Sequence, residues 1–242
     1  MNGFVDIHGH ILADMPHSGS DTVTAIQAIS RLEACAEKYC KTIIAAPLYQ
    51  PSLISEAAFL EQRDAAVAGM CDFALTLSKP VRVAAGAVVP MDDCLFSLRS
   101  PQRFALAETN YILIAPPEVP FDRSLVDYFQ RAGISLKLHP ILADIDRYFD
   151  LYSLEELLSL REYGILTQIS VMGLLNPEHR KLALYLIANG VIQFVASGNS
   201  PMDLPEAMRA LKRSLPLERY KRIKGNSRML LSGAEPHSFL TD

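Results

Sequence analysis

The sequence predicts an α/β fold made of parallel strands arranged as a barrel. Short β-rich runs alternate with helical patterns along the whole chain, and this rhythm is typical of a parallel sheet. The chain has 242 residues, a length that fits one such barrel. A doubly wound open sheet is the alternative, but no G-x-G-x-x-G segment follows any predicted strand, so dinucleotide binding has no support. We expect residues 1–242 to form one domain.

The first half of the chain contains three predicted strands and two predicted helices. Pro47 ends the second predicted strand, and Pro90 ends the third. The third predicted strand contains Gly86. Helical spacing of apolar residues predicts a buried face on the first helix, formed by Val23, Ile26, Ile29, Leu32 and Ala36. The predicted strands are Phe4–His8, Thr42–Ala46 and Val81–Val89, and the predicted helices are Asp21–Tyr39 and Ile54–Leu77.

The second half continues the same alternation. Ser153 and Glu156 form a capping box at one helix start, and Gly164 follows the end of that helix. The predicted strands are Tyr111–Ala115, Ser135–His139, Ile165–Ser170 and Ile192–Ser197. The predicted helices are Asp122–Arg131, Ser153–Tyr163, Pro177–Ala188, Pro205–Ser214 and Leu217–Ile223.

Composition and charge exclude several classes of protein. The formal net charge is −4, whereas a general nucleic-acid binder is expected to be basic, so we expect no nucleic-acid partner. No apolar run reaches the ~18–20 residues of a membrane span, and no basic segment precedes an apolar one at the amino terminus. The four cysteines match no zinc-ribbon or disulfide pattern. We therefore expect a cytoplasmic protein with reduced cysteines.

One segment carries a chemical motif. Asp6-Ile7-His8-Gly9-His10 lies at the end of the first predicted strand, and the carboxyl ends of barrel strands form the active face. Two histidines separated by one residue can turn toward one ion, and imidazole suits zinc, manganese or iron. Two ordinary polar loop residues are the alternative.

Further segments, in the same order along the chain, give a family resemblance. Together with the first motif they resemble the PHP (polymerase and histidinol phosphatase) family, and in particular the bacterial protein-tyrosine phosphatases of capsule and exopolysaccharide operons. The resemblance implies a distorted TIM-like (β/α)7 barrel and a cluster of up to three divalent metals that binds phosphotyrosine and activates water. The segments are Lys41–Pro47, Gly86-Ala87-Val88, Tyr111–Ala115, Leu138-His139-Pro140, Asp146-Arg147-Tyr148 and Phe194–Ser200.

The chain departs from this family at the metal ligands. Of the expected ligands, only His8, His10 and His139 are present, and every carboxylate ligand is replaced. Three neutral imidazoles cannot offset the charge of a metal cluster. We therefore expect no multi-metal centre and at most one weakly bound manganese, zinc or iron ion. The replacements are Leu48 and Tyr49 for two histidines, Val88 and Ala115 for two glutamates, Gly198 and Ser200 for the final Asp and His, and Pro16-His17-Ser18 for an Asp-Asp-Gly loop.

Four other residues are predicted to bind phosphate. Strand alternation places Lys137 on the same face as His139, toward the barrel mouth; a lysine whose charge reaches solvent is the alternative. Asn199 and Ser200 follow the last strand, where backbone N–H groups and hydroxyls can hold phosphate, although a plain turn is the alternative. Arg147 adds a bidentate phosphate contact.

Three functions remain open from the sequence. The first is a catalytically degenerate phosphatase homologue with a binding or regulatory role, whose partner is a phosphotyrosine-bearing protein such as a capsule-assembly kinase. The second is an active metal-dependent phosphoesterase with a site reorganised around His8, His10 and His139, together with carboxylates such as Asp6, Asp14 or Asp144. The third is a barrel that serves subunit assembly. The replaced ligands within an otherwise matching framework favour the first.

Overall fold

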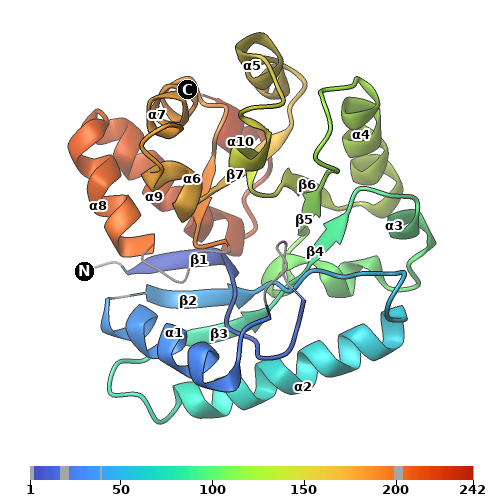
Figure 1. The fold of residues 1–242 in the computed structure, drawn as a ribbon, viewed down its shortest axis with the longest axis vertical. Helices are drawn as coiled ribbons and strands as arrows, with labels where there is room; N and C mark the ends of the chain where they lie inside the picture. Colours follow the sequence, from blue (N-terminus) through green and yellow to red (C-terminus); the bar gives the residue numbers. More distant parts are fainter. Residues whose placement is uncertain (1–2, 17–21, 39, 199–203, 242) are drawn as a thin grey trace.

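The computed structural model describes residues 3–16, 22–38, 40–198 and 204–241. Within them, parallel strands form the centre and helices lie outside (Figure 1). The strands are β1 Phe4–Gly9, β2 Cys40–Ala45, β3 Arg82–Ala85, β4 Val88–Pro90, β5 Tyr111–Ala115, β6 His139–Leu142, β7 Leu166–Ser170 and β8 Phe194–Ala196. The helices are α1 Ala25–Glu37, α2 Glu56–Ala74, α3 Cys94–Ser97, α4 Ser124–Leu136, α5 Leu154–Glu162, α6 Val171–Leu175, α7 Arg180–Ala188, α8 Leu204–Ser214, α9 Leu217–Leu231 and α10 His237–Leu240, with 3-10 turns η1 Pro101–Phe104, η2 Leu106–Glu108 and η3 Ile145–Tyr148.

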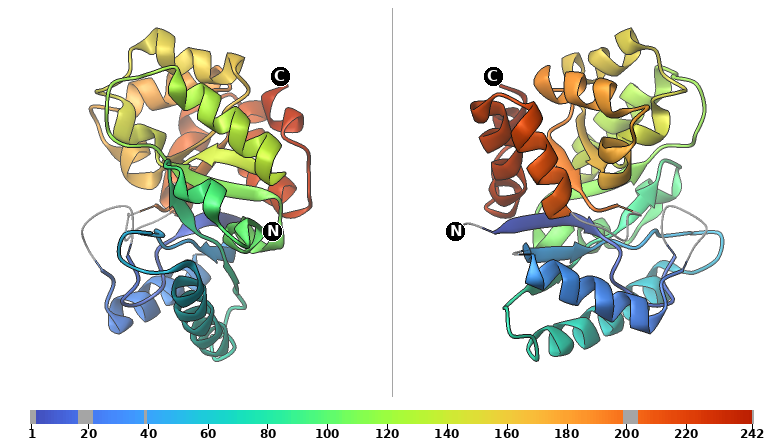
Figure 2. Two further views of the ribbon diagram at one scale, coloured as in Figure 1. Left: turned by 90° about the vertical axis from the view of Figure 1, so that its right-hand side faces the viewer. Right: turned by 60° about the vertical axis from the view of Figure 1, so that its left-hand side comes forward.

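The strands follow chain order around an incompletely closed barrel. They form two parallel sheets, β1-β2-β3 and β4-β5-β6-β7-β8. Isolated bridges link the sheets at both ends, Leu48 to Val88 on one side and Gly9 to Gly198 on the other. In the views of Figure 2, α1 and α2 lie outside the first sheet and most other helices surround the second. This arrangement confirms the predicted α/β class and the parallel strands.

The third predicted strand is divided into β3 and β4 at Gly86-Ala87. A Cβ atom on Gly86 would lie 2.8 Å from both Ile44 Cγ2 and Leu106 Cδ2, so glycine allows the chain to pass close to its neighbours. Beyond this point β4 pairs with β5, while β3 pairs with β2. The two short strands occupy the place of one predicted strand, which agrees with the expected (β/α)7 count.

The core has an inner and an outer part because strand side chains alternate between faces. Ile7, Ile44, Val88 and Leu113 belong to the cluster inside the barrel. Ile43, on the other face of β2, belongs to the cluster beneath the helices. None of the helices in the described part of the chain is long and apolar enough to cross a membrane.

Two sequence predictions about local structure are wrong. The segment predicted as a strand at Ser135–His139 instead continues α4 to Leu136, and β6 begins only at His139. Lys137 between them adopts the left-handed conformation with φ of 55°, which ends the helix and reverses the chain. On the predicted face of the first helix, Val23, Leu32 and Ala36 are buried as expected, but Ile26 is 78% exposed, Ile29 is also exposed, and Ala28 of α1 is buried instead. The prediction was therefore wrong at Ile26 and Ile29.

Candidate functional site at the carboxyl ends of the strands

The two histidines of the first motif are buried side by side. His8 lies near the carboxyl end of β1. Nε2 of His10 lies 3.2 Å from Nε2 of His8. On its other side, Nδ1 of His8 lies 3.1 Å from Oε1 of Gln168 and 3.5 Å from Oδ1 of Asp144. Both nitrogens of His8 are thus engaged, which fixes the orientation of its ring.

Gln168 holds this group together. Its Nε2 donates to Oδ1 of Asp144 at 3.1 Å, and its Oε1 accepts the backbone N–H of Asp144 at 3.1 Å. Gln168 lies in β7, whereas Asp144 follows β6 and has a left-handed φ of 49°. The glutamine therefore joins three neighbouring segments of the barrel mouth through one side chain.

Two further carboxylates lie nearby, Asp6 buried and Asp146 half-buried, and each accepts hydrogen bonds that join two segments of the chain. Asp6 accepts hydrogen bonds from the N–H and Oγ of Ser197, at 3.1 and 2.5 Å, which ties β1 to the segment after β8. Asp146 accepts from the N–H and Oγ of Ser170, at 2.8 and 2.7 Å. Both carboxylates are committed to contacts within the fold.

The buried charges influence one another. Burial disfavours protonation of His8, but the Asp144 carboxylate and the hydrogen bonds at Nδ1 outweigh it and raise the pKa of His8. Burial raises the pKa of Asp144, but the charge of His8, the hydrogen bonds from His8 and Gln168 and the charge of Arg147 together outweigh burial and lower it. Burial raises the pKa values of Asp6 and Asp146. The site thus contains one paired histidine and carboxylate beside two carboxyl groups that are less easily ionised.

The described residues do not fit a multi-metal centre. The 3.2 Å between the two Nε2 atoms suits two ligands of one ion at about 2.0–2.1 Å each, and the contacts at Nδ1 resemble the outer support of a bound histidine. However, residues 3–16, 22–38, 40–198 and 204–241 hold no group of three or more His, Cys, Asp or Glu side chains arranged for a metal. Two imidazoles alone supply no negative charge.

We therefore expect metal loading to leave at most about one weakly held ion per chain. Elemental analysis after loading with manganese, zinc or iron and desalting measures this number. His8→Ala is expected to abolish retention, because one of the two converging nitrogens is lost. His139→Ala is the matched control and should leave retention unchanged. Retention of two or three ions would contradict this expectation.

The structure does not bring His139 to the other two histidines. β6 runs from His139 to Leu142 and Asp144 follows it, so His139 and Asp144 lie at opposite ends of this strand. His139 Nε2 is 3.8 Å from a carboxylate oxygen of Glu235, and its ring packs against Tyr111. The predicted strand ended at His139, whereas the observed strand begins there. His139 therefore lies at the amino end of the strand and not at its carboxyl end.

The predicted phosphate-binding residues are also separated. Lys137 precedes β6 and lies at the amino ends of the strands, so the expectation that it faces the mouth beside His139 is wrong. Arg147 lies beside Asp144 at the carboxyl ends, where its N–H donates to Asp144 O at 3.0 Å and its guanidinium pairs with Glu118. Asn199 and Ser200 lie outside the described residues, as do His17 and Ser18.

Several positions at which the family resemblance expects ligands are built into the core. Tyr49 is 4% exposed, and its ring centroid lies 5.0 Å from that of Phe59 and 5.1 Å from that of Phe104. Val88 is fully buried inside the barrel. At these two positions the replacements are therefore packed apolar contacts.

Sequence reasoning gave no role to Gln168, Ser170 or Asp146. The available signal was the run Leu166–Ser170, in which polar residues occur inside a strand whose five residues are all buried. Buried polar side chains require hydrogen-bond partners, and those of Gln168 and Ser170 are found at the barrel mouth.

The chain is thus a parallel α/β barrel with a buried histidine pair at the carboxyl ends of its strands. The family described as "Capsular polysaccharide synthesis, CpsB/CapC" matches residues 4–225. The chain belongs to this family, which confirms the family resemblance predicted from the sequence. No curated protein sequence matches the chain closely enough to count as a relative.

Solved structures agree on the fold. A chain from the crystal structures of YwqE from Bacillus subtilis and CpsB from Streptococcus pneumoniae, described as metal-dependent tyrosine phosphatases, superimposes with a TM-score of 0.79 and 22% identity, over 96% of this chain and 95% of that one. Histidinol phosphate phosphatase from Lactococcus lactis gives 0.54 and 10%, over 92% and 93%. The β-aspartyl dipeptidase from Fervidobacterium islandicum gives 0.56 and 13%, over 95% and 72%. The distorted TIM-like barrel predicted from the sequence is confirmed.

Proposed function

We propose that this chain is a CpsB/CapC-family protein that keeps the barrel without efficient phosphatase chemistry, and that it binds a phosphotyrosine-bearing protein such as a capsule-assembly kinase. The observation that carries the proposal is the packing of Tyr49 and Val88 into the core, at positions where the family resemblance expects metal ligands. The resemblance expects a histidine at the first position and a glutamate at the second, and a cluster of two or more metals would need such ligands. The commitment of Asp6 and Asp146 to hydrogen bonds within the fold supports the same view.

A binding role needs a cation at the barrel mouth, and Arg147 supplies one. Its partner Glu118 is half exposed, so a phosphate dianion competes with that carboxylate for the guanidinium from solvent. We extend the predicted phosphate contact to Asn199 and Ser200, which follow the same end of the barrel in the chain. The proposal places the protein in the cytoplasm, and the four free cysteines support this placement.

A phosphotyrosine peptide tests both halves of the proposal. With manganese present we expect turnover far below the ~1–1000 s⁻¹ of ordinary enzymes, together with saturable binding of the intact peptide. Arg147→Gln should weaken binding about tenfold, because a charge-assisted contact is lost. Lys137→Gln, a cation at the opposite end of the barrel, is the matched control and should leave binding unchanged.

Two results would contradict the proposal. Hydrolysis at an ordinary enzymatic rate would favour the alternative, an active metal-dependent phosphoesterase built around His8 and His10. A peptide that is neither hydrolysed nor bound would remove the binding role. Calorimetry for binding and phosphate release for turnover separate these results on the same preparation.

A further inference from the structure

The division of the third strand leaves one edge of β3 without a strand partner in the described part of the chain. β3 pairs with β2 along its whole length and is the last strand of its sheet. The neighbour expected on its other side, β4, pairs with β5 instead. On this open side, Val83 O accepts a weak bond from the Cys71 thiol at 3.6 Å. An unpaired strand edge presents backbone donors and acceptors to any chain that lies beside it.

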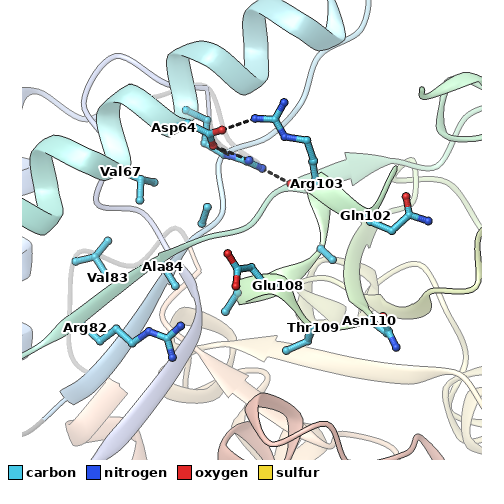
Figure 3. Close-up of a pocket in the computed structure, with 14 residues that line it drawn as sticks. Asp64, Val67, Arg82, Val83, Ala84, Gln102, Arg103, Glu108, Thr109 and Asn110 are labelled. Atoms are coloured by element: carbon cyan, nitrogen blue, oxygen red, sulfur yellow. Dashed lines mark hydrogen bonds and ion pairs between the residues drawn. The ribbon is translucent and has the colours of Figure 1, made fainter. Parts of the chain in front are cut away.

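A cavity of about 570 Å³ runs along this edge (Figure 3). All four residues of β3 line it, together with Arg63, Asp64 and Val67 of α2. The opposite wall consists of residues from Gln102 to Asn110. The volume is typical of ligand sites, and none of the barrel-mouth residues described above lines it.

The opposite wall is shaped so that it does not pair with β3. Ala107 and Glu108 have consecutive left-handed φ values of 49° and 63°, which are uncommon for residues other than glycine. The turn is fixed by Leu106 O, which accepts the N–H of Thr109 at 3.0 Å and its Oγ1 at 2.7 Å. Strained backbone of this kind persists where the surrounding structure enforces it. Here it keeps a slot open beside the strand.

The lining of the slot favours a negatively charged occupant. The lining contains three arginines and two carboxylates, which are Arg63, Arg82, Arg103, Asp64 and Glu108. Arg63 and Arg103 both pair with Asp64. The side chain of Arg82 makes no hydrogen bond or ion pair with any described residue, and its guanidinium reaches into the cavity in Figure 3. A carboxylate beside Arg82 would satisfy this cation.

We propose that the open edge of β3 binds an extended acidic peptide segment of a partner protein by β-strand addition. Main-chain hydrogen bonds to the edge provide affinity, and alternate side chains provide specificity. One set of side chains would meet the apolar wall at Val67 and Val83, and the other would place a carboxylate at Arg82. This interaction surface is separate from the phosphotyrosine site proposed above and does not depend on it.

Calorimetry with capped octapeptides tests the proposal on the full chain. A peptide of alternating valine and glutamate is expected to bind. Alternating valine and lysine should bind at least about tenfold more weakly, because lysine repels Arg82. The valine–glutamate peptide methylated on every second amide nitrogen should also lose about tenfold or more, because it cannot complete the strand ladder.

Variants locate the site. Arg82→Gln should weaken binding of the valine–glutamate peptide about tenfold. Arg99→Gln is the matched control, because Arg99 is also exposed and does not line the slot. Glu108→Gln should strengthen binding severalfold by removing a like charge. Circular dichroism verifies that each variant is folded.

Four outcomes would overturn the proposal. They are no binding of the valine–glutamate peptide, equal binding after methylation, equal binding of capped single glutamate, and equal loss in Arg82→Gln and Arg99→Gln. Equal binding of capped glutamate would indicate a small-anion site instead of strand addition. Light scattering provides a further check, since self-association abolished by Arg82→Gln would identify a second copy of this chain as the occupant.

Discussion

Gly173→Ala is expected to lower the free energy of unfolding by about 4 kcal/mol, the sum of overpacking and of lost hydrogen bonds to the half-buried Asp146 carboxylate. A Cβ atom at this position would lie 2.2 Å from Cβ and 2.3 Å from Cγ of Asp146. Neither atom is the far end of a flexible chain, so η3 must move. That movement breaks the bonds from Ser170 to Asp146 and loosens the segment that carries Asp144.

Urea unfolding measures this effect against a matched control. The control is Gly69→Ala. Gly69 lies in the exposed part of α2, where an added Cβ atom meets nothing within 4 Å. This variant is expected to stabilise the protein by up to about 1 kcal/mol, because alanine is the better helix former. Equal unfolding midpoints for the two variants would show that the contact between Gly173 and Asp146 is not as close as described.

Arg63→Met is expected to cost about 2–4 kcal/mol, because two carbonyl groups lose a charged hydrogen-bond donor. Arg63 is 3% exposed. Its guanidinium donates to Arg103 O at 2.6 Å and Gly86 O at 3.4 Å, and to Oδ1 of Asp64 at 2.9 and 2.7 Å. Methionine fills much of the volume but leaves the carbonyl groups of Gly86, which is buried, and Arg103, which is partly buried, without this donor.

Arg103→Met provides the comparison for this variant. The Arg103 side chain is 54% exposed and pairs with the same carboxylate, at 2.5 Å, so it is expected to cost no more than about 1 kcal/mol. Chemical unfolding of both variants separates the buried network from the surface ion pair. Costs of similar size would mean that Arg63 is solvated and does not support the break between β3 and β4.

Most of the fold could be predicted because its signals are local. Alternating β-rich and helical segments, prolines after strands and the capping box at Ser153 all act within a few residues, and the structure contains both hydrogen bonds of that capping box. The break at Gly86 could not be predicted in this way. It depends on Ile44 and Leu106, which approach from other parts of the chain.

The candidate site was predicted only in part for the same reason. His8 and His10 are neighbours in sequence, so their convergence could be foreseen. The partner of His8 in β7 lies 160 residues away, and a polar residue inside a predicted strand does not identify what it will contact. The error at His139 was local: the residues before it fit a strand as well as a helix, and packing of α4 decided between them.

The closure between Asp6 and Ser197 has a consequence for folding. These residues meet across 191 positions of the chain, whereas the paired strands of each sheet are consecutive in sequence. Joining the two ends of the barrel therefore carries the largest loop entropy of these contacts, and contacts of long range form slowly. Because the bond between His8 and Gln168 also spans the closure, the barrel mouth assembles only when the ends meet. A ligand bound at the mouth would thus report on, and stabilise, the completed fold as a whole.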